Sequence, residues 1–211
     1  MLSEIEVAKE LLKINAIRLR PEDPFTWASG LRSPIYCDNR MTLSYPKLRS
    51  ALKETLSQKA RKYWSYNKVA GVATAGIAHG ALIADYQDLP FIYVRSNTKA
   101  HGARNQIEGM VEEGDECLVV EDLISTGGSS IAAVKVLREA GIVVKGVIAI
   151  FSYELDIAKE NFDRADCSFV TISNYSVLLD AAKALGALTD RQIISLAEWR
   201  NNPQKWSDEC C

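Results

Sequence analysis

Residues 117–141 read CLVVEDLISTGGSSIAAVKVLREAG. Their apolar run Leu118–Val120 is too short for a helix and predicts a buried strand. Apolar residues then recur at helical spacing as far as Gly141, where a helix would end. The stretch therefore predicts a strand, a tight polar loop and a helix in an α/β protein. Such loops, at the carboxyl ends of strands in an open sheet, are where these folds bind ligands.

The loop Ser125–Ser130 combines glycines with hydroxyl side chains. Glycines allow close approach of the backbone, and the first amides of the following helix have no partner within it, so an anion such as phosphate is favoured there. The alternative is that Ser125 or Ser129 simply caps the helix. A single cap does not account for the whole cluster, and neither common nucleotide-binding motif is present.

Two adjacent carboxylates, Glu121 and Asp122, stand between the apolar run and the loop. Neighbouring side chains on a strand point to opposite faces, so both reach one ligand only if the loop bends the chain. Their expected role is to accept hydrogen bonds from sugar hydroxyls or from water on a metal.

This segment resembles the phosphoribosyl-pyrophosphate (PRPP) loop of type I phosphoribosyltransferases. The resemblance implies an α/β fold with a mostly parallel central sheet flanked by helices and a small N-terminal hood. It also implies that the acid pair meets the ribose hydroxyls and that the loop amides hold the 5′-phosphate. The implied PRPP-binding residues here are Glu121, Asp122, Leu123, Ile124, Ser125, Thr126, Gly127, Gly128 and Ser129.

The composition is that of an ordinary globular protein, with 211 residues, 47% hydrophobic and 25% charged. This length fits a single domain over 1–211. The net charge of −2 offers no general attraction to nucleic acid, and no apolar run is long enough for a membrane span. Five cysteines without ligand spacing predict a reducing, cytoplasmic location and no zinc site; the terminal Cys210 and Cys211 suggest no chemistry.

Residues 18–40 are rich in proline, glycine and aromatic side chains, which predicts a loop and a short hairpin turning at Ser29-Gly30. Composition alone favours a surface connection. However, the pattern F-T-x-x-S-G-x-[KR]-S-P-x-Y-x-D-x-R is similar to the N-terminal signature of orotate phosphoribosyltransferases. The resemblance implies that 18–40 and the N-terminal helix form a hood over the base, where the backbone near Tyr36 and Cys37 reads the pyrimidine. Ala28 stands where many members carry a lysine, which Arg32 or Arg40 could replace.

Residues 96–106 form a polar, cationic segment after an expected strand that ends at Arg95. A solvated loop is the ordinary interpretation of such charge, and a flexible lid is the functional one. The pattern R-x-x-x-K-x-H-G resembles the catalytic loop of orotate phosphoribosyltransferases, and implies that Arg95, Lys99 and His101 bind PRPP. Ser96 and Ala100 depart from the residues common in that loop.

The remaining elements follow from periodicity and capping signals. A small-residue turn at Thr74–Gly76 corresponds to the family's pyrophosphate loop, although some members have a lysine at the position of Ala75. Some members also use an arginine to bind orotate, and that arginine is absent here near Tyr153. His79 is expected to pack or lie at the surface. Helices are expected over Glu4–Asn15, from Pro46 with a Ser44 cap, over Ile77–Asp85 and from Thr189 to Arg200; strands over Val69–Ala73, Leu89–Arg95, Val143–Ile150 and Phe169–Ile172; and a hairpin joining Ile107–Val111 to Glu116–Val120.

Together these resemblances imply transfer of the 5-phosphoribosyl group from PRPP to orotate, giving orotidine 5′-monophosphate and pyrophosphate, as in pyrimidine biosynthesis. Lys99, His101 and Asp122 are the implied catalytic residues, and Ser125 lies where it would touch the orotate carboxylate. Mg²⁺ would be held mainly through PRPP and water, with no dedicated protein ligands. The family's lid crosses to a neighbouring subunit, which implies a homodimer.

Two alternatives stay open from sequence. The first is a type I enzyme for another base, such as hypoxanthine or adenine, which would have a different hood. The second is a PRPP-sensing regulator without catalysis. The Lys99–His101 lid and the slightly acidic charge are evidence against the regulator.

Overall fold

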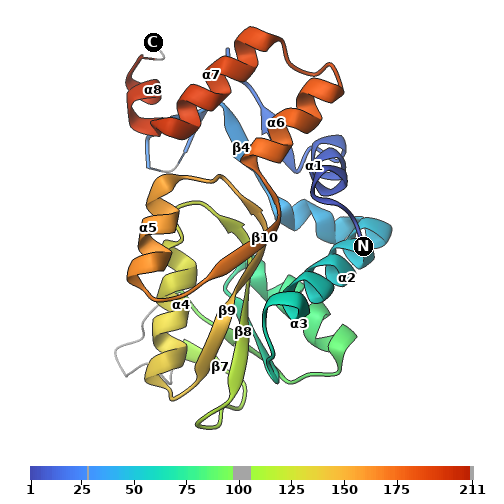
Figure 1. The fold of residues 1–211 in the computed structure, drawn as a ribbon, viewed down its shortest axis with the longest axis vertical. Helices are drawn as coiled ribbons and strands as arrows, with labels where there is room; N and C mark the ends of the chain where they lie inside the picture. Colours follow the sequence, from blue (N-terminus) through green and yellow to red (C-terminus); the bar gives the residue numbers. More distant parts are fainter. Residues whose placement is uncertain (28, 97–105, 210–211) are drawn as a thin grey trace.

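The computed structural model describes residues 1–27, 29–96 and 106–209. Within these residues the centre of the protein is a six-stranded sheet in the order β10-β9-β8-β5-β6-β7 (Figure 1). All neighbouring strands run parallel except β7, which is antiparallel to β6. The strands are β5 (Lys68–Val72), β6 (Phe91–Val94), β7 (Ile107–Glu108), β8 (Glu116–Ile124), β9 (Val143–Ser152) and β10 (Phe169–Asn174). The predicted α/β class with a mostly parallel sheet is confirmed.

Helices cover both faces of this sheet, which explains why its central strands are apolar without alternation. Leu118 and Val120 of β8 pack in a core with α2 (Pro46–Tyr63) and α3 (Ala75–Gln87). Val119 points the other way, into a second core with α4 (Gly128–Glu139) and α5 (Asp156–Arg164). The two helix pairs flank the sheet on opposite sides in Figure 1. Strand alternation therefore divides one apolar run between two hydrophobic cores.

Local signals located most of the helices. Capping boxes at Ser3 and Thr189 begin α1 (Glu4–Lys13) and α7 (Asp190–Asn201), as expected. Pro46 opens α2, but the Ser44 cap is wrong. Ser44 instead ends a 3-10 helix, η1 (Asn39–Ser44), and Tyr45 precedes α2 without a side-chain cap bond among the described residues.

The expected hairpin between Ile107–Val111 and Glu116–Val120 is also wrong. Ile107 and Glu108 pair with Val94 and Tyr93 of β6, at the edge of the sheet. β8 lies further in, between β5 and β9, because its fully apolar run is buried on both faces.

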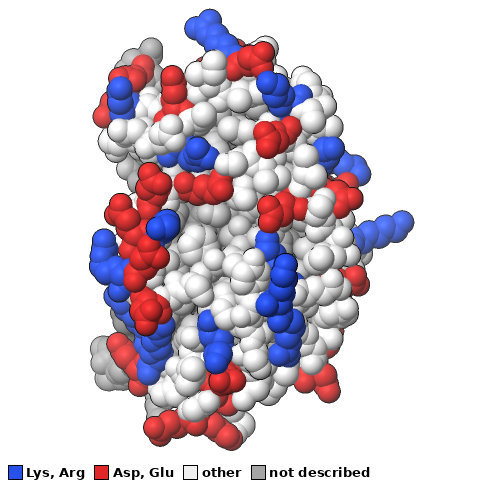
Figure 2. Space-filling model, in the orientation of Figure 1, with Lys and Arg blue, Asp and Glu red and all other residues white. Residues whose placement is uncertain are grey.

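The N-terminal segment and the C-terminal helices lie together at one end of the molecule (Figure 1). In the described residues, β1 (Ile17–Leu19) pairs with β4 (Ile35–Cys37), and β2 (Phe25–Thr26) pairs with β3 (Arg32–Ser33) around the expected turn, where Gly30 has φ +86°. The predicted hood segment, residues 18–40, is contacted by α8 (Pro203–Glu209) through β3, and α6 (Tyr175–Ala184) follows β10. Among the described helices, none is long and apolar enough to cross a membrane. Figure 2 shows acidic and basic side chains interspersed over one face.

Candidate functional site

The acid pair lies within β8, which continues four residues beyond Val120. Glu121 is buried, with 6% of its surface exposed, and Asp122 is half-buried. The backbone N–H of Asp122 donates to Oε1 of Glu121 at 3.1 Å, and the hydroxyl of Ser130 lies 3.4 Å from Oε2. The strand and the first turn of α4 therefore hold Glu121 from both sides.

Burial sets the protonation of these carboxyls. Loss of solvent and the neighbouring Asp122 raise the pKa of Glu121 to about 9. Burial also raises the pKa of Asp122 above its ordinary value. Burial therefore favours the protonated form of Glu121.

The loop after β8 reaches α4 through Gly127, whose φ of +78° is in the left-handed region. A Cβ there would lie 2.7 Å from the ring of Phe162, so both the backbone angle and the space favour glycine. Among the described residues, no side chain caps this end of α4. The interpretation of Ser125 or Ser129 as a simple cap is therefore wrong, and the first amides of α4 stay open to an anion.

The other residues predicted in this loop differ in what they expose. Ile124 is fully buried and Leu123 half-buried, so a ligand above the loop meets Ile124 through its backbone. Ser125 is half-buried, and Thr126, Gly128 and Ser129 are exposed. The side-chain amide of Asn161 on α5 donates to the carbonyl of Thr126 at 3.0 Å, which holds the loop against the fold.

A cavity of about 310 Å³ lies beside this loop. Its walls are the first turns of α4, including Gly128 and Ser129, the ends of β5 and β6, and Gln106. Arg95 follows β6 as expected and also lines the cavity, where its guanidinium contacts Glu108 at 3.0 Å. Lys99 and His101, the main residues of the predicted lid, lie outside the described residues.

The turn after β5 packs closely against the backbone of β8. The Ala73–Thr74 peptide bond is cis, and α3 begins at Ala75, two residues earlier than expected. A Cβ on Gly76 would lie 2.4 Å from the carbonyl oxygen of Val120, immediately before the acid pair. This contact places the predicted pyrophosphate turn next to Glu121.

His79 is buried in α3, with 3% of its surface exposed. Burial lowers its pKa to about 4, and its Nε2 has no hydrogen-bond partner in the described part of the chain. The residue packs in the interior, as expected.

The hood carries Tyr36 and Cys37 on β4. The antiparallel register pairs Arg18 with Tyr36, and the guanidinium of Arg18 lies 4.9 Å from the centre of the Tyr36 ring. Hydrogen-bonded and non-hydrogen-bonded residue pairs alternate along antiparallel strands. The backbone N–H and C=O of Tyr36 therefore face β1, and those of Cys37 face away from it. Burial and the nearby Asp122 raise the pKa of the Cys37 thiol well above its ordinary value. Cys37 is thus the hood residue that lies near the acid pair.

Sequence reasoning missed what anchors the hood. Trp27 stacks on Tyr153 at 5.5 Å and meets Trp199 edge-on at 5.8 Å. Tyr153, at the position where some relatives have an arginine, is buried with its pKa raised well above the ordinary value by burial. The only signal in the sequence was aromatic content, which does not specify contacts over more than a hundred residues.

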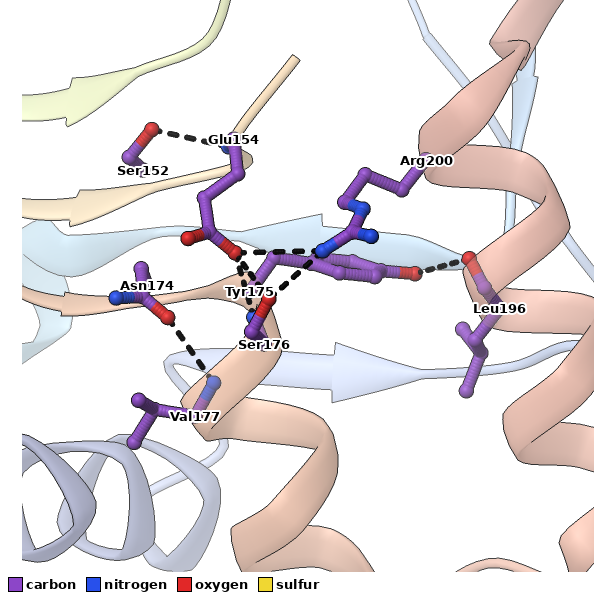
Figure 3. A network of polar contacts seen from close by, with 8 residues as sticks. All are labelled: Ser152, Glu154, Asn174, Tyr175, Ser176, Val177, Leu196 and Arg200. Atoms are coloured by element: carbon purple, nitrogen blue, oxygen red, sulfur yellow. Dashed lines mark hydrogen bonds and ion pairs between the residues drawn. The ribbon is translucent and has the colours of Figure 1, made fainter.

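The arginines near these positions are engaged in the fold. Arg40, one of the expected substitutes for a lysine, forms a two-pronged ion pair with Asp38 at 2.6 and 2.8 Å. The backbone N–H of Arg32 donates to Ser207 of α8 at 2.9 Å. Arg200 of α7 lies beside Glu154 at 3.6 Å and donates to Ser176 at 2.7 Å (Figure 3).

The network in Figure 3 joins the end of β9 to two C-terminal helices. Glu154 accepts hydrogen bonds from the backbone and hydroxyl of Ser176, at the start of α6, at 2.8 and 2.6 Å. The Tyr175 hydroxyl donates to the carbonyl of Leu196 in α7 at 2.9 Å. This network fixes the helices that support the hood.

A mostly parallel sheet that brings an acid pair, an uncapped helix N-terminus and a neighbouring tight turn close together has the arrangement expected of a type I phosphoribosyltransferase. The family model described as "Phosphoribosyl transferase domain" matches residues 43–178, which include both the turn and the acid pair. An orotate phosphoribosyltransferase from Bacillus mycoides (strain KBAB4) is 51% identical over 199 residues, which are 94% of this chain and 95% of that protein. The chain belongs to the orotate phosphoribosyltransferase family.

Solved structures agree with this assignment. An orotate phosphoribosyltransferase from Aeropyrum pernix superposes with a TM-score of 0.74 and 29% identity, covering 87% of this chain and 99% of that one. UMP synthase from Leishmania donovani superposes with a TM-score of 0.80 and 26% identity. That match covers 94% of this chain but 42% of the longer protein.

Proposed function

We propose that this protein transfers the 5-phosphoribosyl group from PRPP to orotate, which forms orotidine 5′-monophosphate and pyrophosphate in pyrimidine biosynthesis. The observation that carries the proposal is the uncapped N-terminus of α4 behind the acid pair of β8, of which Glu121 is buried. Such a helix end binds a phosphate through its amides. The relative from Bacillus mycoides, which is 51% identical to this chain, supports orotate as the base.

In this proposal each part of the site has one task. Glu121 and Asp122 contact the ribose hydroxyls, while the loop from Leu123 to Ser129 holds the 5′-phosphate. The bond to the anomeric carbon breaks as negative charge grows on the departing pyrophosphate, so positioned cations supply most of the catalysis. Arg95, Lys99 and His101 are assigned to that charge, and His101 is the candidate proton donor.

The base is assigned to the hood. The Cys37 backbone groups, which face away from β1, are suited to read the pyrimidine, with Tyr36 beside them. Ser125 is assigned to the orotate carboxylate. Its half-buried position at the end of β8 is compatible with that contact.

Mg²⁺ is proposed as the cofactor. No group of three or more His, Cys, Asp or Glu side chains in the described residues is arranged to hold a metal ion. Because Mg²⁺ prefers phosphate oxygens and keeps several waters, the ion is expected to bind mainly to PRPP and water, with Asp122 nearby. When bound, it would neutralise part of the pyrophosphate charge.

A homodimer with a shared lid is proposed as the working form. The proposal is supported by the resemblance of Arg95–Gly102 to the family's lid, which crosses to a neighbouring subunit. A cytoplasmic location is proposed as well, since Cys37, Cys117 and Cys167 are free thiols.

The direct test is ultraviolet absorbance of orotate in the presence of PRPP and Mg²⁺, compared with hypoxanthine and adenine under the same conditions. Consumption of orotate alone is expected. Turnover of a purine instead would assign another base, and PRPP binding without turnover of any base would indicate a regulator.

The shared lid has its own test. Mixed dimers of Lys99→Ala and Asp122→Asn subunits should regain part of the activity that each variant lacks, because one intact site combines a wild-type lid with a wild-type acid pair. Absence of rescue in verified mixed dimers would contradict sharing.

A further inference from the structure

The carbonyl of Asp122 accepts a hydrogen bond from outside the sheet. Pairing of β5 with β8 ends at Gly71 and Val120, two residues earlier. On the other side the parallel ladder continues past Asp122, since Glu121 pairs with Ala149 and Leu123 with Phe151. A backbone carbonyl has two lone pairs, so this one can accept a bond from another part of the molecule beside its place in the ladder.

That partner is Asn39, the first residue of η1. Its side-chain amide donates to the carbonyl of Asp122 at 2.7 Å, across 83 positions of sequence. Asn39 is fully buried, and the Thr42 hydroxyl donates to its backbone carbonyl at 2.6 Å. The rigid short helix therefore holds the amide in place against the end of β8, with which η1 is in contact.

The orientation of the Asn39 amide follows from chemistry. Its Oδ1 is buried and has no partner among the described residues. Rotation of the amide would place this oxygen against the Asp122 carbonyl, where two acceptors repel. Asn39 also stands only two residues after Cys37, the last residue of β4. One amide thus joins the segment assigned to the base to the strand of the acid pair.

We propose that Asn39 is a positioning residue that couples the pyrimidine-binding hood to the ribose-binding carboxylate of Asp122. The inference rests on the proposed function, because it assigns Cys37 to the base and Asp122 to the sugar. Asn39 touches neither substrate in this scheme. It sets the distance between the two halves of the site, so that the base nitrogen and the anomeric carbon meet in a productive geometry.

The test compares two buried polar residues of the same short helix. Asn39→Ala removes the bond to Asp122, whereas Thr42→Val removes a hydroxyl that bonds to Asn39's own carbonyl. Both variants should lose thermal stability. Only Asn39→Ala should lower kcat/KM for PRPP and for orotate, each by about 10- to 100-fold, the scale of a small misplacement of reacting groups.

A second arm separates positioning from general damage. In an Asp122→Asn background, which keeps the carbonyl and removes the charge, Asn39→Ala should add less than about a threefold further loss of kcat/KM. If Asn39→Ala does not fold, Asn39→Ser replaces it, since its hydroxyl is too short to reach the same carbonyl.

Full additivity with Asp122→Asn, or equal kinetic loss in Thr42→Val, would overturn the role of Asn39. The proposed function fails separately, if the wild-type protein does not convert orotate with PRPP.

Discussion

The phosphate loop and the hood are built in opposite ways. The loop lies within one continuous segment, from β8 to α4, and a left-handed glycine and an uncapped helix end set its shape. The hood is held by contacts from distant segments, through Trp27 to Tyr153 and Trp199, and through Asn39 to Asp122. The loop therefore tolerates little local change, whereas the hood depends on the C-terminal helices for its position.

The largest expected effect belongs to the predicted lid. Lys99→Ala should lower kcat by about 10²- to 10³-fold, because the proposed function assigns this cation to the charge of the departing pyrophosphate. Thermal unfolding should change little. Lys135→Ala on the exposed side of α4 is the matched control and should keep its turnover. Near-normal turnover of Lys99→Ala would remove the lid from the mechanism.

Two glycines with similar backbone angles allow a direct comparison of the stability of the hood and the phosphate loop. Gly30 in the hood and Gly127 in the loop both have positive φ, but only Gly127 is crowded by another side chain. Gly30→Ala should lower the free energy of unfolding by about 1 kcal/mol from the backbone alone. Gly127→Ala should lower it by roughly 2–4 kcal/mol, since overpacking against Phe162 adds to the same strain.

Denaturant unfolding measures both variants, and calorimetric titration with PRPP should show weaker binding for Gly127→Ala only. Equal losses in the two variants would mean that the loop is no more constrained than the hood turn.

Removal of Trp27, which anchors the hood, should change the KM for orotate and not the KM for PRPP. Trp27→Ala should raise the KM for orotate by up to about tenfold, because the stacked and edge-on ring contacts are lost. The KM for PRPP should stay within a factor of about two, since the loop does not contact Trp27 in this scheme. Trp64→Ala, which removes a ring packed on Gly146 at the other end of β9, is the control for lost aromatic packing. Equal changes in both KM values would show that hood and loop do not act separately.

The last prediction concerns the buried acid between the two regions and is read in the pH dependence of stability, not in turnover. Its pKa is raised from 4.5 in an ordinary setting to about 9, so the folded state keeps a proton that the unfolded chain releases. Stability from this group is therefore lost as pH rises from about 4.5 to about 9. Glu121→Gln stays neutral and should flatten the dependence of Tm on pH in that window. Glu139→Gln at the exposed end of α4 should not.

The contrast between the locally built loop and the hood held by distant segments also explains which elements could be predicted from the sequence. Residues 117–141 were interpreted correctly as strand, loop and helix because apolar runs and glycines are local signals. Ser44 was mistaken for a cap because the pattern does not distinguish a 3-10 turn from the loop before α2. The pairing of Ile107 with β6 depends on how the chain returns after residues 97–105, which no local pattern encodes.

In the site, too, the local features were predictable from the sequence and the long-range contacts were not. The acid pair and the loop lie together, as their adjacency in sequence requires, whereas the roles of Lys99 and His101 stay predictions outside the described residues. Asn39 was not singled out, because a hydrogen bond between η1 and β8 leaves no periodic or compositional trace.

The stacking of Trp27 on Tyr153 has an optical consequence. The chain has four tryptophans, and Trp27 is the one on the hood hairpin, half-buried against a ring from the end of β9. Its indole emission responds to the polarity around it, so the enzyme carries a built-in fluorophore on the segment that the proposed function assigns to the base. Movement of the hood during turnover would register as a spectral change without any attached dye.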